Sequence, residues 1–431
     1  MGKNSRRRHL DKKRRANERR RRHAATPPPN TEPVDQPIRS RSNSTDDGTA
    51  QGAAATHRQL EQFLGLVLRD RLWARGWQPD ELLRHVRRSS SQAASAVVAM
   101  AIADDAAHHD RVGYALHDAW RRQADRILAE GLHEPGLEGW IARWLDAGGD
   151  GVDLATVCDV LDELVRLPSL PVLIPPPGST PGVDMGDAFL DPTPKLRTIR
   201  GLLAKAESTE FPAEAEAFTV KAQAMMADAR IDEATVRART GQRTTARVSA
   251  VRIGIDAPYV ASKQMLLHVV AEANDVRCVF HRSLDLATLV GPVGQLVSVE
   301  LLFTSLLIQV NSFLVADAAT VSAGSLLRSR SYRSSFIMGF AQRIGERLQA
   351  VRRTTFADAR DDALPVLTAD DRATTELFDR LIGRTTKFSS SSRYDAVGAR
   401  AGARAADRAS LRESGLEGRG VDPSRGLRDA G

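Results

Sequence analysis

Residues 195–230 carry the stretch that decides the fold, KLRTIRGLLAKAESTEFPAEAEAFTVKAQAMMADAR. Apolar side chains recur there at helical spacing on both sides of a break at residues 208–212, which ends in Pro212. The pattern predicts two antiparallel helices joined by a short turn over residues 195–236. The first apolar stripe consists of Leu196, Ile199, Leu202, Leu203 and Ala206, and the second of Phe218, Ala222, Met225 and Ala229.

The sequence that follows this hairpin predicts an α+β domain over residues 237–388. Two short β-rich runs, residues 276–281 and 286–290, are separated by a polar turn and predict a pair of strands. Helical periodicity predicts helices at residues 259–272, 293–315, 332–351 and 370–382. Residues 237–250 are polar and predict a loop, whereas the tail at residues 389–431 is rich in Ser, Arg, Gly and Ala and predicts weak structure.

The sequence that precedes the hairpin predicts a helical domain at residues 56–167 and a linker at residues 168–194. Within the first, Gly76-Trp77-Gln78-Pro79-Asp80-Glu81 predicts the start of a helix. Proline suits the first helical turn, and acidic residues there face the positive end of the helix dipole. The linker contains eight prolines, a composition typical of an extended spacer.

Residues 1–55 lack hydrophobic periodicity and predict a disordered basic arm, because they offer too little apolar surface to offset the entropy of ordering. Residues 1–22 hold 12 Lys and Arg against two acidic residues, a net charge of +10, whereas the remainder of the chain has a net charge of −3. This asymmetry is typical of a tail for a polyanionic partner. The candidate nucleic-acid-binding residues are Arg6, Arg7, Arg8, Lys12, Lys13, Arg14, Arg15, Arg19, Arg20, Arg21 and Arg22.

The predicted fold class is therefore mostly α with a small α+β C-terminal domain, a helical N-terminal domain and a disordered basic arm. Two cysteines far apart in sequence, Cys158 and Cys278, exclude a disulfide framework and fit a reducing compartment. Polar residues interrupt the apolar stretch at residues 296–315, which favours a buried helix over a membrane span. No apolar segment follows the basic N-terminus as in a signal peptide, so we expect a cytoplasmic protein with no membrane partner.

Three elements of the hairpin resemble the signature of the bacterial and phage family called domain of unknown function 2786. They are Leu202-Leu203-Ala204-Lys205-Ala206-Glu207-Ser208, then Glu214-Ala215-Glu216-Ala217, then Lys221-Ala222-Gln223-Ala224-Met225-Met226. The following region is similar to the companion domain usually found behind that hairpin. Its matching pieces are Val290-Gly291-Pro292, residues 331–340, and Gly398, Gly402 and Asp407.

This resemblance covers residues 195–410 and implies a fold, since the family has no established activity. Residues 76–79 are also similar to the helical N-terminal extension of actinobacterial members of the family. The family motif contributes the polar residues Lys205, Glu214, Lys221 and Gln223. Glu214 and Lys221 are seven positions apart and share a helix face. A lysine near a carboxylate can hold a phosphate group, and the alternative is a solvated face that fixes the hairpin by ion pairs.

Metal ligands are sparse in the sequence. Asp105 and His109 are one helical turn apart, a spacing that supports a metal, and Cys278 and His281 lie close together in a predicted strand. No second ligand pair completes either set, so the sequence predicts no metal site and no cofactor. It also lacks a Gly-x-Ser-x-Gly elbow and a Gly-Lys-Ser/Thr phosphate loop.

Three functions remain open from the sequence. The first is a binding protein for DNA or RNA, in which the basic arm supplies salt-sensitive affinity. The second is an enzyme, for example a hydrolase acting on nucleic acid, with a site between the hairpin and the α+β domain where Lys205, Glu214 and Lys221 gather. The third is a protein–protein interaction scaffold, marked by a large exposed apolar patch on residues 56–167.

Overall fold

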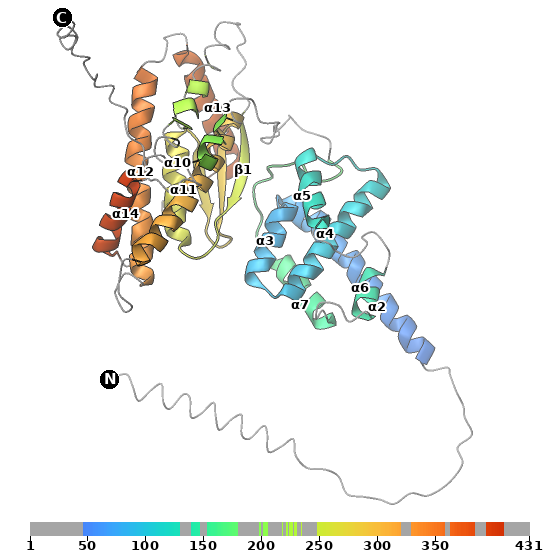
Figure 1. The fold of residues 1–431 in the computed structure, drawn as a ribbon. Helices are drawn as coiled ribbons and strands as arrows, with labels where there is room; N and C mark the ends of the chain where they lie inside the picture. The colour runs from blue at the N-terminus through green and yellow to red at the C-terminus, as the bar shows by residue number, and fades with distance from the viewer. Residues whose placement is uncertain are drawn as a thin grey trace, which may run out of the picture. The chain divides into compact units, whose positions relative to one another are not determined.

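A computed structural model of the chain describes residues 46–129, 139–146, 153–179, 248–319, 329–357, 363–383 and 394–408, together with single residues and short pieces between 198 and 234. The chain divides into two compact units, Met1–Ala53 and Ala54–Gly431. The second unit contains a helical region, residues 54–179, and an α+β region, residues 248–408 (Figure 1). The fold class predicted from the sequence, mostly α with a small α+β part, is confirmed.

The helical region consists of short helices whose ends follow local sequence rules. Gly76 adopts a left-handed conformation and ends one helical run, and Pro79 then occupies the first turn of the next helix. Ser91 and Asp153 cap two later helices by accepting backbone N–H bonds. The elements are α2 (Asp46–Leu66), the π-helix η1 (Val67–Leu72), the 3-10 helix η2 (Trp73–Arg75), α3 (Pro79–Ser89), α4 (Gln92–Val112), α5 (Asp118–Leu128), α6 (Trp140–Asp146) and α7 (Leu154–Arg166).

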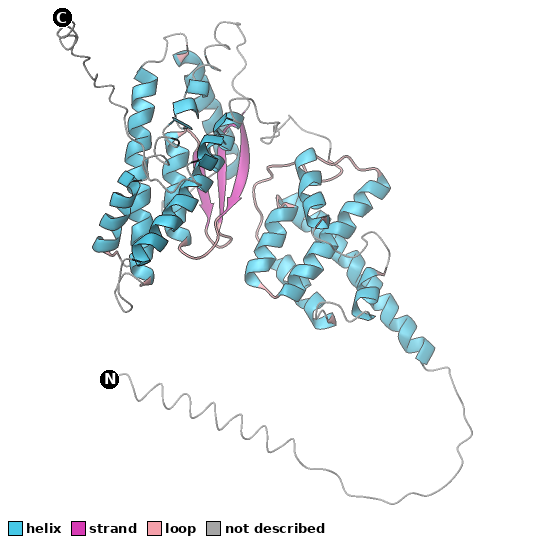
Figure 2. Ribbon diagram, in the orientation of Figure 1, coloured by secondary structure: helices cyan, strands magenta, loops and turns pink. Residues whose placement is uncertain are grey.

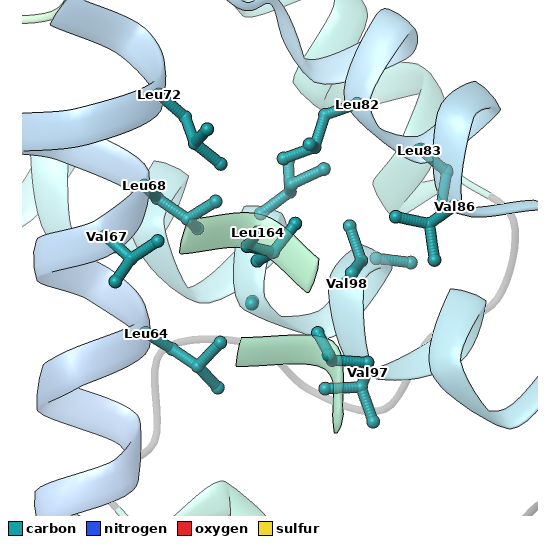
Figure 3. Close-up of a cluster of buried hydrophobic side chains, with 14 of the residues drawn as sticks. Leu64, Val67, Leu68, Leu72, Leu82, Leu83, Val86, Val97, Val98 and Leu164 are labelled. Carbon is teal, nitrogen blue, oxygen red and sulfur yellow. The ribbon is translucent and has the colours of Figure 1, made fainter. Parts of the chain in front are cut away.

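One hydrophobic cluster forms the core of this region. Figure 3 shows leucine and valine side chains from several helices pointing toward one another, including Leu68, Leu82 and Leu164. Trp73 and Trp120 add bulk and meet edge to face, with ring centroids 5.8 Å apart. Two polar side chains, Asp105 and His109, are buried within this core.

The α+β region is built on a three-stranded antiparallel sheet, drawn in magenta in Figure 2. Its strands are β1 (Val248–Gly254), β2 (Arg277–His281) and β3 (Leu286–Pro292), in the order β1-β3-β2. The central strand β3 is buried along its whole length, as expected for a mostly apolar run in the middle of the sheet. The helices are α10 (Val260–Ala273), α11 (Val293–Ala319), α12 (Arg330–Ala357), α13 (Leu364–Ile382) and α14 (Ala396–Arg408).

Most elements predicted for the α+β region are confirmed. Three predictions are wrong, two in this region and one at the end of the basic arm. Residues 248–250, predicted as loop, begin strand β1. Residues 396–408, predicted as part of a weakly structured tail, form helix α14. Residues 46–55, predicted as part of the disordered arm, lie in α2. Strand β1 and helix α14 depend on partners distant in sequence, which local periodicity does not reveal.

Small residues let α12 and α14 approach closely. A Cβ atom built on Gly402 would lie 1.9 Å from the carbonyl oxygen of Phe336, and one on Gly339 would lie 2.0 Å from that of Ala399. Arg343 then closes the pair by donating to Asp407, with 2.5 Å between the nitrogen and the carboxylate oxygen. Gly402 and Asp407 thus have a structural role in this helix pair. The resemblance to a companion domain, which includes both residues, stays a prediction.

Helix α11 is apolar and long enough to cross a membrane by length and composition alone, over Val293–Val315. In the part of the chain that the structure describes, 56% of its most apolar window is buried within the protein. Leu296, Val299 and Leu302 pack into the second hydrophobic cluster, as in the core helix of a soluble protein. The sequence prediction of a buried helix agrees with this packing.

Within the second unit, one arginine ties strand β1 to the helical region. The side chain of Arg252 is fully buried, and its Nε lies 2.6 Å from Oε1 of Glu81. Its other nitrogens donate to the backbone carbonyls of Gly76 and Pro171. Leu170 and Leu173 come from the proline-rich stretch predicted as a linker, and both are buried in hydrophobic clusters. The predicted domain boundaries stay predictions.

Candidate anion-binding site

A cavity of about 470 Å³ opens beside helix α3. Helices α3 and α5 supply most of its walls, and one residue comes from the segment after β1. The lining residues are Asp80, Leu83, Arg84, Arg87, Arg88, Arg126, Ile127 and Asp256. Four of these eight side chains are arginines, so the cavity has the composition of an anion site.

The sequence of α3, PDELLRHVRRS, explains how one helix gives three of these arginines. Leu82, Leu83 and Val86 are buried against the core. Arg84, Arg87 and Arg88 are spaced three and four positions apart, so they lie on neighbouring positions of one helix face. Arg126 comes from α5, which contacts α3, and it completes the group of four arginines.

Aspartates hold three of the four arginines in place. Arg84 contacts Asp256 at 2.6 Å, Arg88 pairs with Asp285, and Arg126 pairs with Asp80. The side chain of Asp256 is 70% exposed. The pair with both partners exposed, Arg126 with Asp80, contributes about 0–1 kcal/mol, so a competing anion can replace that carboxylate at little cost.

The cavity lining has a net charge of +2, because four arginines face the two carboxylates of Asp80 and Asp256. His85, on the same helix, adds no charge at neutral pH, because burial lowers the pKa of its imidazole below the ordinary value of 6.5. Leu83 and Ile127 also line the cavity, but each is only 2% exposed. The arginine and aspartate side chains therefore form nearly all of the accessible surface of the site.

The candidate residues predicted from the sequence lie elsewhere. The eleven basic residues of the arm, Glu214 and Gln223 are outside the residues that the structure describes. Lys205 and Lys221 are both exposed, and the Nζ of Lys205 lies 5.7 Å from the ring centroid of Phe218. The enzyme hypothesis, which places a site around Lys205, Glu214 and Lys221, stays a prediction, because Glu214 lies outside the described residues.

The predicted pair Asp105 and His109 is buried in the core of the helical region. The Asp105 carboxylate accepts from Arg69 at 2.8 Å and from the indole of Trp73 at 2.7 Å, and lies 3.1 Å from Nε2 of His109. These partners fill the positions that a metal would need. His281 contacts Thr288 at 2.7 Å, and the described residues hold no group of three or more metal ligands.

The scaffold hypothesis looks for exposed apolar residues within 56–167. They include Phe63 and Leu66 on α2 and Leu154 on α7.

The arginine cavity was not predicted from the sequence. The signal that could have found it is the run of three arginines on one face of α3, directly after the predicted helix start. Nothing local connects that run to Arg126 or Asp256.

These features define a mostly helical protein with an α+β region and an arginine-lined cavity. Residues 195–233 match a family described as "Protein of unknown function (DUF2786)". The match confirms the resemblance over these residues, which include both helices of the predicted hairpin, and does not extend to the companion domain. The comparisons with curated proteins and with solved structures gave no match.

Proposed function

We propose that this protein binds nucleic acid in the bacterial cytoplasm, with the arginine-lined cavity as a phosphate site and the basic arm as an electrostatic tether. The observation that carries the proposal is the convergence of Arg84, Arg87, Arg88 and Arg126 on one cavity. Arginine presents paired N–H donors that match the oxygens of a phosphate group. Cys158 and Cys278 are both free, as expected in a reducing compartment.

The two basic features would contribute different parts of the binding energy. The arm carries a net charge of +10 over residues 1–22, and neutralising phosphates releases counterions, so its contribution depends steeply on salt. The cavity offers arginine donors from two contacting helices, α3 and α5, an arrangement that suits a phosphate group. The arm would recruit the strand and the cavity would position it.

The test compares oligonucleotide binding by four forms of the full chain across a salt series. They are the unaltered protein, a form lacking residues 1–45, the double variant Arg87→Gln/Arg126→Gln, and the control Arg372→Gln. Residue 45 is the last residue before α2, and Arg372 is an exposed arginine on α13, outside the cavity lining, paired with Glu376.

Loss of the arm should lower the slope of log affinity against log salt by several units, at about 0.9 per phosphate contact on duplex DNA. The double variant should bind at least about ten times more weakly at fixed salt, since it loses two charge-assisted contacts. The control should bind like the unaltered protein. Equal binding by the double variant and the control would reject the cavity as the phosphate site.

A further inference from the structure

We infer that the cavity selects a phosphomonoester, the terminal phosphate of a nucleic-acid strand, over an internal phosphodiester. This inference rests on the proposed function and names the group that the site takes. It follows from three properties of the lining: its net charge, the nature of the groups that an incoming anion must displace, and the position of exposed carboxylates in the wall.

The charge balance favours a terminal phosphate. The lining carries +2. Two charged groups that contact it cancel each other, because Asp285 pairs with Arg88 and the ammonium of Lys263 lies 2.8 Å from the carbonyl oxygen of Asp256. A phosphomonoester has a charge of about −1.5 to −2 at pH 7. It would neutralise the cavity, whereas an internal phosphodiester brings a single negative charge and leaves about half the positive charge unbalanced.

Any anionic ligand must bind the arginines more strongly than the carboxylates that already pair with them. Asp256 and Asp80 each offer a singly charged group with two oxygens to the arginines. An internal phosphodiester also offers a single charge and two free oxygens, so exchange gains little. A phosphomonoester offers a larger charge and three acceptor oxygens, so it can engage more arginine donors than the carboxylate it displaces.

The same carboxylates act against a strand that passes through the cavity. Such a strand would carry phosphates on both sides of the bound one. The exposed carboxylates of Asp80 and Asp256 would repel these flanking phosphates, since like charges placed close together are unfavourable. A strand end has a flanking phosphate on one side only. A volume of about 470 Å³ is also within the range of pockets that enclose a small molecule, and accommodates a terminal nucleotide.

The experiment uses the full chain and single-stranded oligonucleotides of one sequence, with a 5′-phosphate, with a 3′-phosphate, or with hydroxyl groups at both ends. Fluorescence anisotropy at fixed salt measures the three affinities. We expect at least one phosphorylated form to bind about ten times more tightly than the hydroxyl form. The double variant Arg87→Gln/Arg126→Gln should lose this preference, and Arg372→Gln should keep it.

The outcomes separate this inference from the proposed function. Equal affinity for all three oligonucleotides, together with weaker binding by the double variant, would overturn the inference and leave the proposed function standing. Absence of binding to every oligonucleotide would overturn both. A nucleoside monophosphate that binds as tightly as the phosphorylated strand would also overturn it, because the cavity would then be a site for free nucleotides.

Discussion

The helical region and the α+β region differ in the side chains that hold their helices together. The helical region buries charged groups in its core, with Asp105 held by Arg69 and Trp73. In the α+β region, the closest helix pair relies on missing side chains, because α12 and α14 meet at Gly339 and Gly402. A core built on charge pairs depends on each partner being present, whereas a core built on close backbone approach depends on side chains being absent.

The cavity arginines and the family match also lie in different parts of the chain. The cavity arginines lie on α3 and α5 of the helical region. The family match covers residues 195–233, outside the helical region, and Gly398, Gly402 and Asp407 of the α+β region pack α14 onto α12 or pair with it. If the cavity is the binding site, the helical region supplies its arginines, and the α+β region supplies Asp256 in the lining and Asp285 as the partner of Arg88.

The largest expected effect is on the buried charge network. Asp105→Asn removes the negative charge that compensates Arg69, and loss of one partner of a buried pair is strongly destabilising. We expect the free energy of unfolding to fall by about 3 kcal/mol. The five tryptophans at positions 73, 77, 120, 140 and 144 all lie in the helical region, so denaturant unfolding followed by tryptophan fluorescence reports on it directly.

The matched control is the adjacent residue. Burial raises the pKa of the Asp104 carboxyl, so replacing its charge with a neutral amide in Asp104→Asn removes an unfavourable burial of charge. We expect a change within about 0.5 kcal/mol. Equal destabilisation by the two variants would show that the Asp105 network is no more important to the core than its neighbour.

The second effect tests the glycine contacts of the α+β region. Gly402→Ala places a methyl group against the Phe336 carbonyl, and forcing α12 and α14 apart should cost about 2 kcal/mol. Gly294→Ala adds the same methyl group in α11, where nothing lies within 4 Å, and should stabilise that helix by up to about 1 kcal/mol. Thermal unfolding followed by circular dichroism measures both, and a comparable loss in the two variants would contradict the account of this helix pair.

The third prediction distinguishes binding residues from stabilising ones. Arg87→Gln/Arg126→Gln should change the free energy of unfolding by less than about 1 kcal/mol, because Arg126 and Asp80 form an exposed pair. The same variant is the one expected to lose nucleic-acid affinity. A loss of stability above about 2 kcal/mol in chemical denaturation would mean that these arginines hold the helical region together.

The smallest effect concerns His281 in strand β2. Burial, helped by the nearby charge of Arg252, lowers the pKa of its imidazole below 6.5. The unfolded chain therefore binds more protons below about pH 6.5, so this group's contribution to stability is present above that pH and is lost as the pH falls. His281→Asn should lose less stability than the unaltered protein between pH 7.5 and 5.5 in denaturant titrations. Equal losses of unfolding free energy in the two proteins would show that His281 does not contribute to this pH dependence.

Local sequence patterns predicted the helices and the strands β2 and β3, because each depends on neighbours in the chain. Strand β1 was missed because it pairs with β3 over a long separation, Val251 with Leu289 for example. Helix α14 was missed because its glycines read as a flexible tail until α12 is placed against them. The cavity was missed for the same reason, since Arg126 and Asp256 reach α3 only through the tertiary fold.

The most direct test of the central claim is photochemical crosslinking of the full chain to an oligonucleotide with a photoreactive base at its phosphorylated end, with the crosslinked peptides mapped by mass spectrometry. The account predicts crosslinks in α3 and α5, at residues 79–89 and 118–128, which disappear in Arg87→Gln/Arg126→Gln. Crosslinks confined to residues 1–45, or unchanged in that variant, would contradict it.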